Sequence, residues 1–143
     1  MKTEKKRILV VDDESNMTFL LRVIFERTKE YQVKVVNISS RAVAVAKEFQ
    51  PDLILLDVAM PGMDGGELAS RFTEIPSLKT VPVIFLTASV TRKEVSQRDG
   101  LIGGLPFLAK PVDPTELLRC IRKHLGVDSS TEAWPTVLEE AVR

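Results

Sequence analysis

Short runs of apolar residues alternate along this chain with segments in which apolar residues recur at helical spacing. Continuous apolar runs bounded by turn-forming residues are typical of strands buried on both faces. Two segments follow an i, i+3, i+4, i+7 pattern, namely Met17, Leu20, Leu21 and Ile24, and Ala42, Val45, Ala46 and Phe49. The patterns predict strands at residues 7–11, 33–37, 52–56, 82–86 and 106–109, and helices at residues 14–28, 40–49, 65–73, 91–98 and 114–125. Five successive strand–helix units predict an α/β fold with one doubly wound, five-stranded parallel sheet.

Two of these elements carry additional signals. In the 33–37 strand the polar Lys34 lies between two valines, and this alternation predicts a half-exposed strand at an edge of the sheet. Before the last helix, Asp113 is a good N-cap residue and Pro114 fits the first helical position, with the acidic Glu116 in the first turn. The beginning of the last helix is therefore the best-marked helix start in the chain.

The composition describes one domain without a strong charge field. The 143 residues suffice for a sizeable core. Lys plus Arg and Asp plus Glu both number 20, so neither nucleic acid nor an anionic membrane is expected as a partner. The single cysteine, Cys120, excludes an internal disulfide, and no apolar run approaches membrane-spanning length. We expect a cytoplasmic protein with a tail at residues 1–6, a domain at 7–125, and a linker with a short candidate helix at 126–143.

Chemically reactive side chains lie at the ends of four predicted strands. Asp12 and Asp13 follow the first strand, Asp57 the third, Thr87 the fourth and Lys110 the fifth. In an open parallel sheet the carboxyl ends of the strands share one edge, and ligands bind there at the point where the strand order reverses. We therefore expect these residues to form one site.

Three carboxylates at one edge repel one another. Two unit charges about 4 Å apart interact by roughly 4 kcal/mol at an effective dielectric constant of about 20, and one lysine cannot offset all of these repulsions. Either a carboxyl group stays protonated or a divalent cation lies among them. Mg²⁺ fits the second alternative because it binds few carboxylates, keeps water molecules and recruits phosphate oxygens. This chemistry predicts a phosphate-containing reactant.

Asp57 is the candidate nucleophile, because a carboxylate can accept a phosphoryl group and form an aspartyl-phosphate. It stands alone at the end of the most apolar run, whereas Asp12 and Asp13 form a pair suited to holding a metal. Lys110 is expected to contact the transferred phosphoryl oxygens, and the hydroxyl of Thr87 to donate a hydrogen bond to one of them.

The acidic pair, the segment LLDVAMPGMDG, Thr87-Ala88 and Lys110-Pro111 resemble the receiver domain of two-component response regulators. The resemblance spans about residues 6–125, and five motifs in order make it specific. It implies a three-layer α/β/α, flavodoxin-like fold with strand order 2-1-3-4-5. It also implies phosphoryl transfer to Asp57 from a sensor histidine kinase or a phosphotransfer protein. The chain would then be a signalling phosphoacceptor that catalyses its own phosphorylation and dephosphorylation, without an attached output domain and with an unknown output partner.

The resemblance also implies how the metal is bound. Asp13 and Asp57 would hold Mg²⁺ directly, Asp12 would hold it largely through water, and Ala59 would contribute its backbone carbonyl. The peptide bond before Pro111 would be cis.

A switch pair, Thr87 and Phe107, follows from the same resemblance. Thr87 would move toward the phosphoryl group, and Phe107, three residues before the lysine, would rotate inward. A near-complete shift between two states needs about 5.5 kcal/mol of differential stabilisation, more than one charged hydrogen bond supplies. Binding of a partner is therefore expected to contribute to the switch.

The chain departs from the usual receiver pattern before the lysine. The family often carries a pattern of the type Gly-Ala-x-Gly-Tyr before the lysine. Here the corresponding residues are Gly103, Gly104, Leu105, Pro106 and Phe107. The 91–98 segment has almost no apolar stripe with which a helix could dock. We predict at most two turns of helix there, then an irregular mobile loop to residue 105, and an output surface made mainly by Phe107 and the 114–125 helix.

Two further positions affect the lifetime of the phosphoryl group in the family. Ala59 and Ser89 occupy them here, and neither offers an acid or amide to orient attacking water. A long-lived aspartyl-phosphate is the expected consequence.

Three other interpretations are open. In the first, the acidic pair serves merely to cap the first helix. Asp57 could be the nucleophile of a Mg²⁺-dependent hydrolase, although Ala59 stands where a general acid would serve best. The chain could also be a pure interaction module related to receivers, whose expected signature is the loss of an acidic residue or of the lysine.

Overall fold

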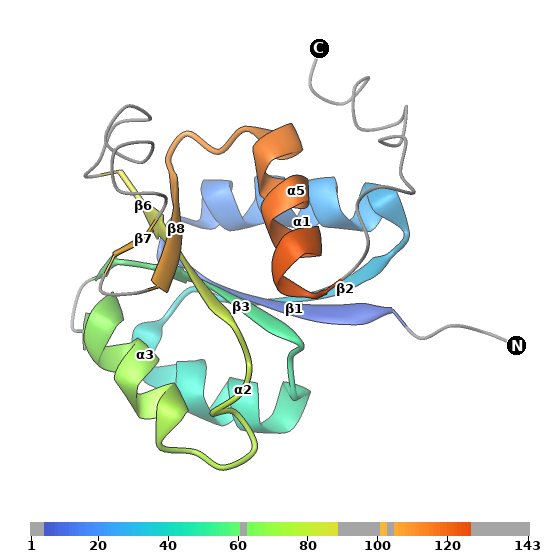
Figure 1. The fold of residues 1–143 in the computed structure, drawn as a ribbon. Helices are drawn as coiled ribbons and strands as arrows, with labels where there is room; N and C mark the ends of the chain where they lie inside the picture. The colour runs from blue at the N-terminus through green and yellow to red at the C-terminus, as the bar shows by residue number, and fades with distance from the viewer. Residues whose placement is uncertain (1–4, 61–62, 89–100, 103–104, 127–143) are drawn as a thin grey trace, which may run out of the picture.

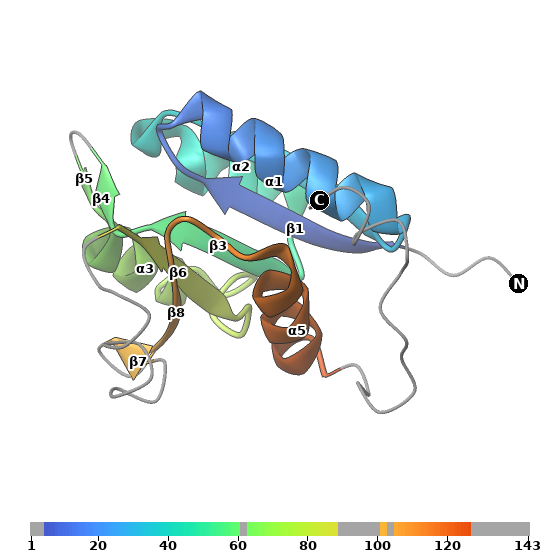
Figure 2. The same ribbon diagram turned by 90° about the horizontal axis from the view of Figure 1, so that it is seen from above.

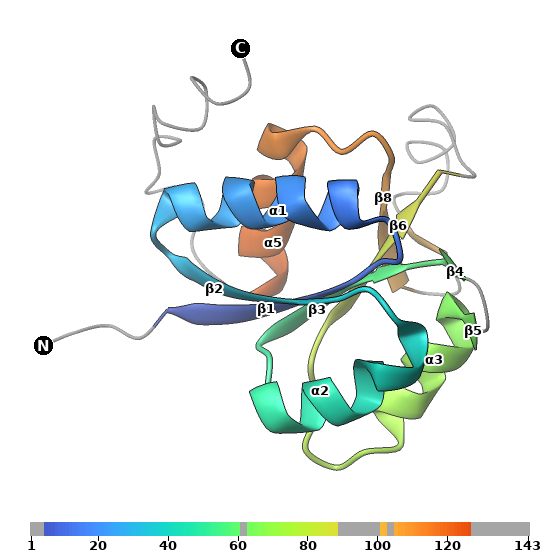
Figure 3. The same cartoon turned by 180° about the vertical axis from the view of Figure 1, so that it is seen from behind.

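The computed structural model describes residues 5–60, 63–88, 101–102 and 105–126 of the chain. A central β-sheet lies between two layers of helices (Figure 1). Helices α1 (Ser15–Thr28) and α5 (Pro114–His124) cover one face, and α2 (Ala42–Phe49) and α3 (Gly65–Thr73) cover the other, as the view from behind also shows (Figure 3). The predicted three-layer α/β/α architecture is confirmed.

Five of the six strands of the main sheet run parallel to one another. They are β1 (Lys6–Val11), β2 (Tyr31–Val36), β3 (Leu53–Asp57), β6 (Val83–Thr87) and β8 (Leu105–Ala109). Their spatial order is β2-β1-β3-β6-β8, which is the predicted order 2-1-3-4-5. The register pairs Val10 with Leu55, Leu55 with Ile84, and Leu86 with Leu108. Residues at the carboxyl ends of β1, β3, β6 and β8 are thereby aligned at one edge.

Alternating side chains of the central strands divide the core between the two faces. On β1, Ile8 and Val10 belong to the apolar cluster under α1 and α5, whereas Leu9 and Val11 belong to the cluster under α2 and α3. All four side chains are fully buried. Burial of such a side chain contributes about 1.5–3 kcal/mol. Both faces therefore hold β1 in place and fix the position of the residues that follow it.

The helices begin and end close to the predicted residues, but the buried face of α1 is rotated from the predicted one. Leu21, Ile24 and Phe25 are buried in α1, whereas Leu20 is 47% exposed. The apolar pattern included Leu20 because spacing alone cannot show where the covered stripe ends. At α5, the side chain of Asp113 accepts a hydrogen bond of 3.0 Å from the backbone N–H of Thr115. The predicted N-cap is thus confirmed.

Two short pairings were not predicted. Strands β4 (Ala59–Met60) and β5 (Met63–Asp64) pair antiparallel, and this hairpin projects beyond the carboxyl end of β3 (Figure 2). Strand β7 (Leu101–Ile102) pairs antiparallel with the beginning of β8. The expectation of an irregular loop to residue 105 is wrong at β7. Strands of two residues are too short to produce a detectable hydrophobic period.

The remaining expectations fall partly inside the described residues. Strand β2 lies at the end of the sheet order, and Lys34 is exposed, so the predicted edge strand is confirmed. Within the described part of the chain, no helix has both the length and the apolar character needed to cross a membrane. The predicted 91–98 helix, Ser89, residues 1–4 and the segment after Gly126 lie outside the described residues.

Candidate functional site

The carboxyl edge of the sheet gathers the predicted acidic residues. Asp12 and Asp13 follow β1 directly, and Asp57 is the last residue of the neighbouring strand β3. One carboxylate oxygen from each of the three lies within 4.8 Å of the others. The predicted cluster is therefore present, and its position follows from the parallel pairing of two central strands.

Burial differs among the three carboxylates. Asp12 is fully buried and Asp57 is 5% exposed, whereas Asp13 is exposed. Buried carboxylates need charge partners because removal from water disfavours the ionised form. Asp13 opens the cluster to solvent, so a hydrated ion can reach it from outside.

Lys110 is the charge partner of this cluster. Its Nζ lies 2.8 Å from Oδ2 of Asp12, 2.8 Å from Oε1 of Glu14 and 3.6 Å from Oδ2 of Asp57. Burial alone would lower the pKa of Lys110, but hydrogen bonds to Asp12 and Glu14 and the charges of Asp12 and Asp57 outweigh it and hold the pKa above its usual range. The lysine is therefore a permanent cation in this site.

The backbone around Lys110 explains how the lysine reaches the cluster. Its N–H donates to the carbonyl of Thr87 at 2.8 Å, which extends the pairing of β6 and β8 by one residue. The Lys110–Pro111 peptide bond is cis, as the resemblance implied. Because Thr87 is itself the last residue of β6, the threonine and the lysine are held at the same level of the sheet.

Glu14 belongs to the site although the sequence analysis did not identify it. Its backbone N–H donates to Oδ1 of Asp12 at 3.0 Å, and its side chain, 61% exposed, accepts from Lys110. The hydrogen bond and the positive charge of Lys110 hold the pKa of Glu14 below its usual value. The available signal was its place directly after the acidic pair, which makes three consecutive acidic residues.

The same geometry decides between capping and site formation for the acidic pair. The N-cap residue of α1 is Glu14, and its side chain makes no capping hydrogen bond. Asp12 accepts from the N–H of Glu14, before the helix begins, and not from the first turn of α1. The interpretation of Asp12 and Asp13 as mere helix caps is wrong.

The donor set of this edge fits Mg²⁺. Oδ2 of Asp12 is buried and lies 2.8 Å from Nζ of Lys110, and a carboxylate oxygen has more than one lone pair, so it can also face a second cation. Carboxylate oxygens are the ligands that Mg²⁺ prefers, and Mg²⁺ tolerates a site with few protein ligands. Ala59, the proposed carbonyl ligand, begins β4 two residues after Asp57.

The segment that follows Asp57 is fixed by backbone hydrogen bonds. The N–H of Val58 donates to the carbonyl of Leu86 at 3.0 Å, and the carbonyl of Val58 accepts from the N–H of Gly65 at 2.8 Å. These bonds tie the end of β3 to β6 on one side and to the beginning of α3 on the other. Asp57 is therefore presented from a rigid part of the fold.

Comparison with known proteins identifies the family. A model of the response regulator receiver domain matches residues 8–122. The chain belongs to the response regulator receiver domain family. Members of this family are signalling phosphoacceptors of two-component systems that interact with histidine kinases or phosphotransfer proteins.

Relatives of this receiver domain occur alone and within longer proteins. It is 32% identical over 125 residues to sporulation initiation phosphotransferase F of Bacillus subtilis, covering 87% of this chain and 98% of that protein. It is 34% identical over 126 residues to the DNA-binding response regulator MtrA of Mycolicibacterium smegmatis, covering 87% of this chain and 53% of MtrA. The receiver domain thus spans about half the length of that DNA-binding relative.

Solved structures show the same fold. The receiver domain of sensor histidine kinase PA1611 from Pseudomonas aeruginosa, which has a magnesium ion coordinated in its active-site cleft, matches with a TM-score of 0.71 and 26% identity, covering 86% of this chain and 99% of that one. A putative response regulator from Chloroflexus aurantiacus matches with a TM-score of 0.73 and 28% identity, covering 86% and 99%.

The expected switch residues of this receiver domain are both buried. Thr87 and Phe107 are each 2% exposed. Phe107 is paired with Phe85 on the neighbouring strand and belongs to the apolar cluster on the α2 and α3 face. The expectation that Phe107 forms part of an exposed output surface is therefore wrong in this conformation, because its ring is enclosed by the apolar core.

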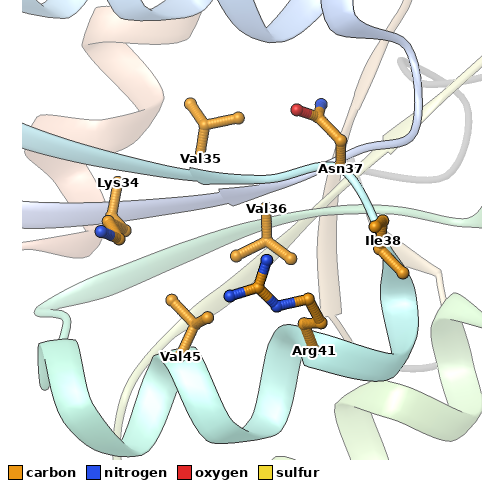
Figure 4. Close-up of a pocket in the computed structure, with 7 residues that line it drawn as sticks. All are labelled: Lys34, Val35, Val36, Asn37, Ile38, Arg41 and Val45. Carbon is orange, nitrogen blue, oxygen red and sulfur yellow. The ribbon is translucent and has the colours of Figure 1, made fainter.

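A separate hollow of about 250 Å³ lies between β2 and α2 (Figure 4). It is lined by Lys34, Val35, Val36, Asn37, Ile38, Arg41 and Val45. It shares no residue with the acidic cluster. The hollow is therefore separate from the acidic cluster at the carboxyl edge.

Proposed function

We propose that Asp57 accepts a phosphoryl group from the phosphohistidine of a sensor histidine kinase or of a phosphotransfer protein, in a reaction that requires Mg²⁺. The observation that carries this proposal is the convergence of Asp12, Asp13 and Asp57 within 4.8 Å, with Lys110 Nζ 3.6 Å from Asp57. Phosphoryl transfer depends mainly on positioning and charge neutralisation, and these residues supply both.

In the proposed reaction, a carboxylate oxygen of Asp57 forms a bond to phosphorus as the bond between phosphorus and the donor imidazole nitrogen breaks. The electron pair of the broken bond stays on the imidazole. Mg²⁺, held by Asp13 and Asp57, by Asp12 through water and by the carbonyl of Ala59, would neutralise charge on the phosphoryl oxygens. Lys110 neutralises the remaining charge, and the hydroxyl of Thr87 donates a hydrogen bond to one phosphoryl oxygen.

The proposed output is a change in the balance between two conformations. Movement of Thr87 toward the phosphoryl group would favour the state in which Phe107 stays inside. Since one charged hydrogen bond contributes only about 1.5–3 kcal/mol, an output partner that prefers this state would complete the shift. The receiver is proposed to act in the cytoplasm. Its output partner is proposed to be a protein, because a net charge of zero provides no attraction for nucleic acid.

The rival functions fit the site less well. A hydrolase using Asp57 would need a general acid beside the leaving group, and position 59, two residues beyond, is alanine. A pure interaction module would not need the acidic residues and the lysine together. Here Lys110 lies within 2.8 Å of Asp12 and the three aspartates form one cluster.

The proposal is tested by incubating the protein with acetyl phosphate and Mg²⁺ and measuring intact mass. We expect a mass increase of one phosphoryl group that hydroxylamine removes and that excess chelator prevents. Asp57→Asn should remain unmodified, while Asp52→Asn, which directly precedes the opposite end of β3, should react like the wild type. Absence of modification in the wild type, or modification of Asp57→Asn, would overturn the proposal.

A further inference from the structure

We propose that Glu14 is a positioning residue that holds Lys110 away from Asp57 until a phosphoryl group competes for the lysine. The inference rests on the proposed function, because it concerns the same transfer to Asp57. Glu14 is neither the phosphoryl acceptor nor one of the expected metal ligands.

The three contacts of Lys110 are unequal. Its ammonium group lies 2.8 Å from Glu14 and from Asp12, but 3.6 Å from Asp57. The last distance exceeds that of a charge-assisted hydrogen bond, which is about 2.7–2.9 Å. In the unmodified protein the lysine is therefore bound to the two carboxylates beside the acceptor and not closely to the acceptor itself.

Glu14 is the contact that can be released. Asp12 is fully buried, so loss of its lysine would leave a buried charge unpaired. The side chain of Glu14 is 61% exposed, and water can solvate its carboxylate after release. An ammonium group has three N–H donors, so Lys110 can keep Asp12 while it exchanges Glu14 for a phosphoryl oxygen.

The backbone of Glu14 is fixed, so the reach of its side chain determines this contact. Its N–H donates to Asp12 at 3.0 Å, and its carbonyl accepts from the N–H of Thr18 at 3.1 Å as α1 begins. Aspartate at this position would keep the charge but would be shorter by one methylene group. Glu14→Asp therefore weakens the tether to Lys110 without removing the negative charge from the site.

Glu14 also adds a negative charge beside the path of an anionic phosphodonor. Removal of this charge and release of the lysine would both accelerate phosphorylation, but they affect different quantities. Removal of the charge lowers the donor concentration that gives half of the limiting rate. Release of Lys110 from Glu14 raises the limiting rate itself. Comparison of Glu14→Gln with Glu14→Asp separates the two effects.

The experiment measures the phosphorylation rate of the full chain against acetyl phosphate concentration at saturating Mg²⁺. We expect a limiting rate about two- to fivefold higher for both Glu14→Asp and Glu14→Gln, the range set by the strength of an exposed ion pair. Only Glu14→Gln should also lower the half-saturating concentration. The matched control is Glu30→Gln, which removes another partly exposed carboxylate, one that pairs with Arg122 at 2.8 Å, and which should change neither quantity.

A second measurement uses the metal-free, unmodified protein. The NMR resonance of the Lys110 ε-methylene group should shift in both Glu14 variants and stay unchanged in Glu30→Gln, whatever the rates. If the wild type is phosphorylated but both Glu14 variants react at its rate or more slowly, the role of Glu14 is overturned while the proposed function stands. If the wild type itself is not phosphorylated, the proposed function fails.

Discussion

Gly65 packs directly against the backbone of Asp57. A β-carbon added to Gly65 would lie 2.5 Å from the carbonyl oxygen of Asp57 and 2.8 Å from the α-carbon of Val58. Both neighbours are backbone atoms held by hydrogen bonds from β6 and α3, so neither can move away easily. The first residue of α3 must therefore be small if Asp57 is to keep its position.

Gly65→Ala is expected to destabilise the fold by about 1–3 kcal/mol, as overpacking does, and to slow phosphorylation because Asp57 shifts. The control is Gly126→Ala. Gly126 has a φ of 75° and no atom within 4 Å of an added β-carbon, so alanine there should lower stability through backbone strain alone and leave phosphorylation unchanged. Denaturant unfolding and intact-mass kinetics measure the two effects, and a fully active Gly65→Ala protein would contradict the expectation.

Mg²⁺ should bind weakly to the unmodified protein, because it gives up its water reluctantly. A concentration ten times the dissociation constant should stabilise the wild type by about 1.4 kcal/mol, seen as a rise in Tm. Asp13→Ala should remove this rise and prevent phosphorylation, while Asp52→Asn should preserve both. Undiminished Mg²⁺ stabilisation in Asp13→Ala would show that Asp13 is not a ligand.

The aspartyl-phosphate should be long-lived, because alanine at position 59 cannot orient an attacking water molecule. Ala59→Asn should accelerate hydrolysis of the aspartyl-phosphate by about tenfold. A positioned acid or base contributes about 10²–10⁴-fold, but an amide only orients the water molecule and takes no proton from it, so we expect a smaller effect. Decay of the phosphorylated mass after removal of the donor provides the rate. Ala44→Asn, an exposed position on α2, should leave the rate unchanged, and an equal effect at both positions would exclude a specific role for Ala59.

Cys120 should be unreactive at neutral pH. Burial in α5 raises the pKa of its thiol to about 11, although the charge of Lys123 acts in the opposite direction. Well below both pKa values, the folded protein should hold about a hundredfold less thiolate than the unfolded chain. The folded state favours the protonated thiol, and this preference contributes to the free energy of unfolding at neutral pH. The contribution is lost as the pH rises from about 9 toward 11, because the unfolded chain releases the proton first.

Alkylation by iodoacetamide provides the measurement, since Cys120 is the only cysteine. The rate should still increase above pH 9 in the folded protein, whereas in denaturant it should level off at the ordinary pKa of a thiol. A folded-state rate that levels off near pH 8.5 would contradict the raised pKa of this partly buried thiol.

The sequence by itself determined the fold class, the strand order through its family resemblance, and the membership of the acidic cluster. Asp12, Asp13 and Asp57 each follow a continuous apolar run, and such runs are central parallel strands whose carboxyl ends share one edge. The edge position of β2 was equally readable, because Lys34 interrupts its apolar pattern. These properties depend on the local order of apolar and polar residues, which the sequence displays directly.

Only the tertiary structure decided which side chains touch. The contact between Glu14 and Lys110 joins residues 96 positions apart, and no periodic pattern specifies the reach of two flexible side chains. Burial of Phe107 and exposure of Leu20 likewise depend on which neighbouring surfaces cover them. Hydrophobic spacing identifies the residues that share a face, but packing against the rest of the chain determines how much of that face is removed from water.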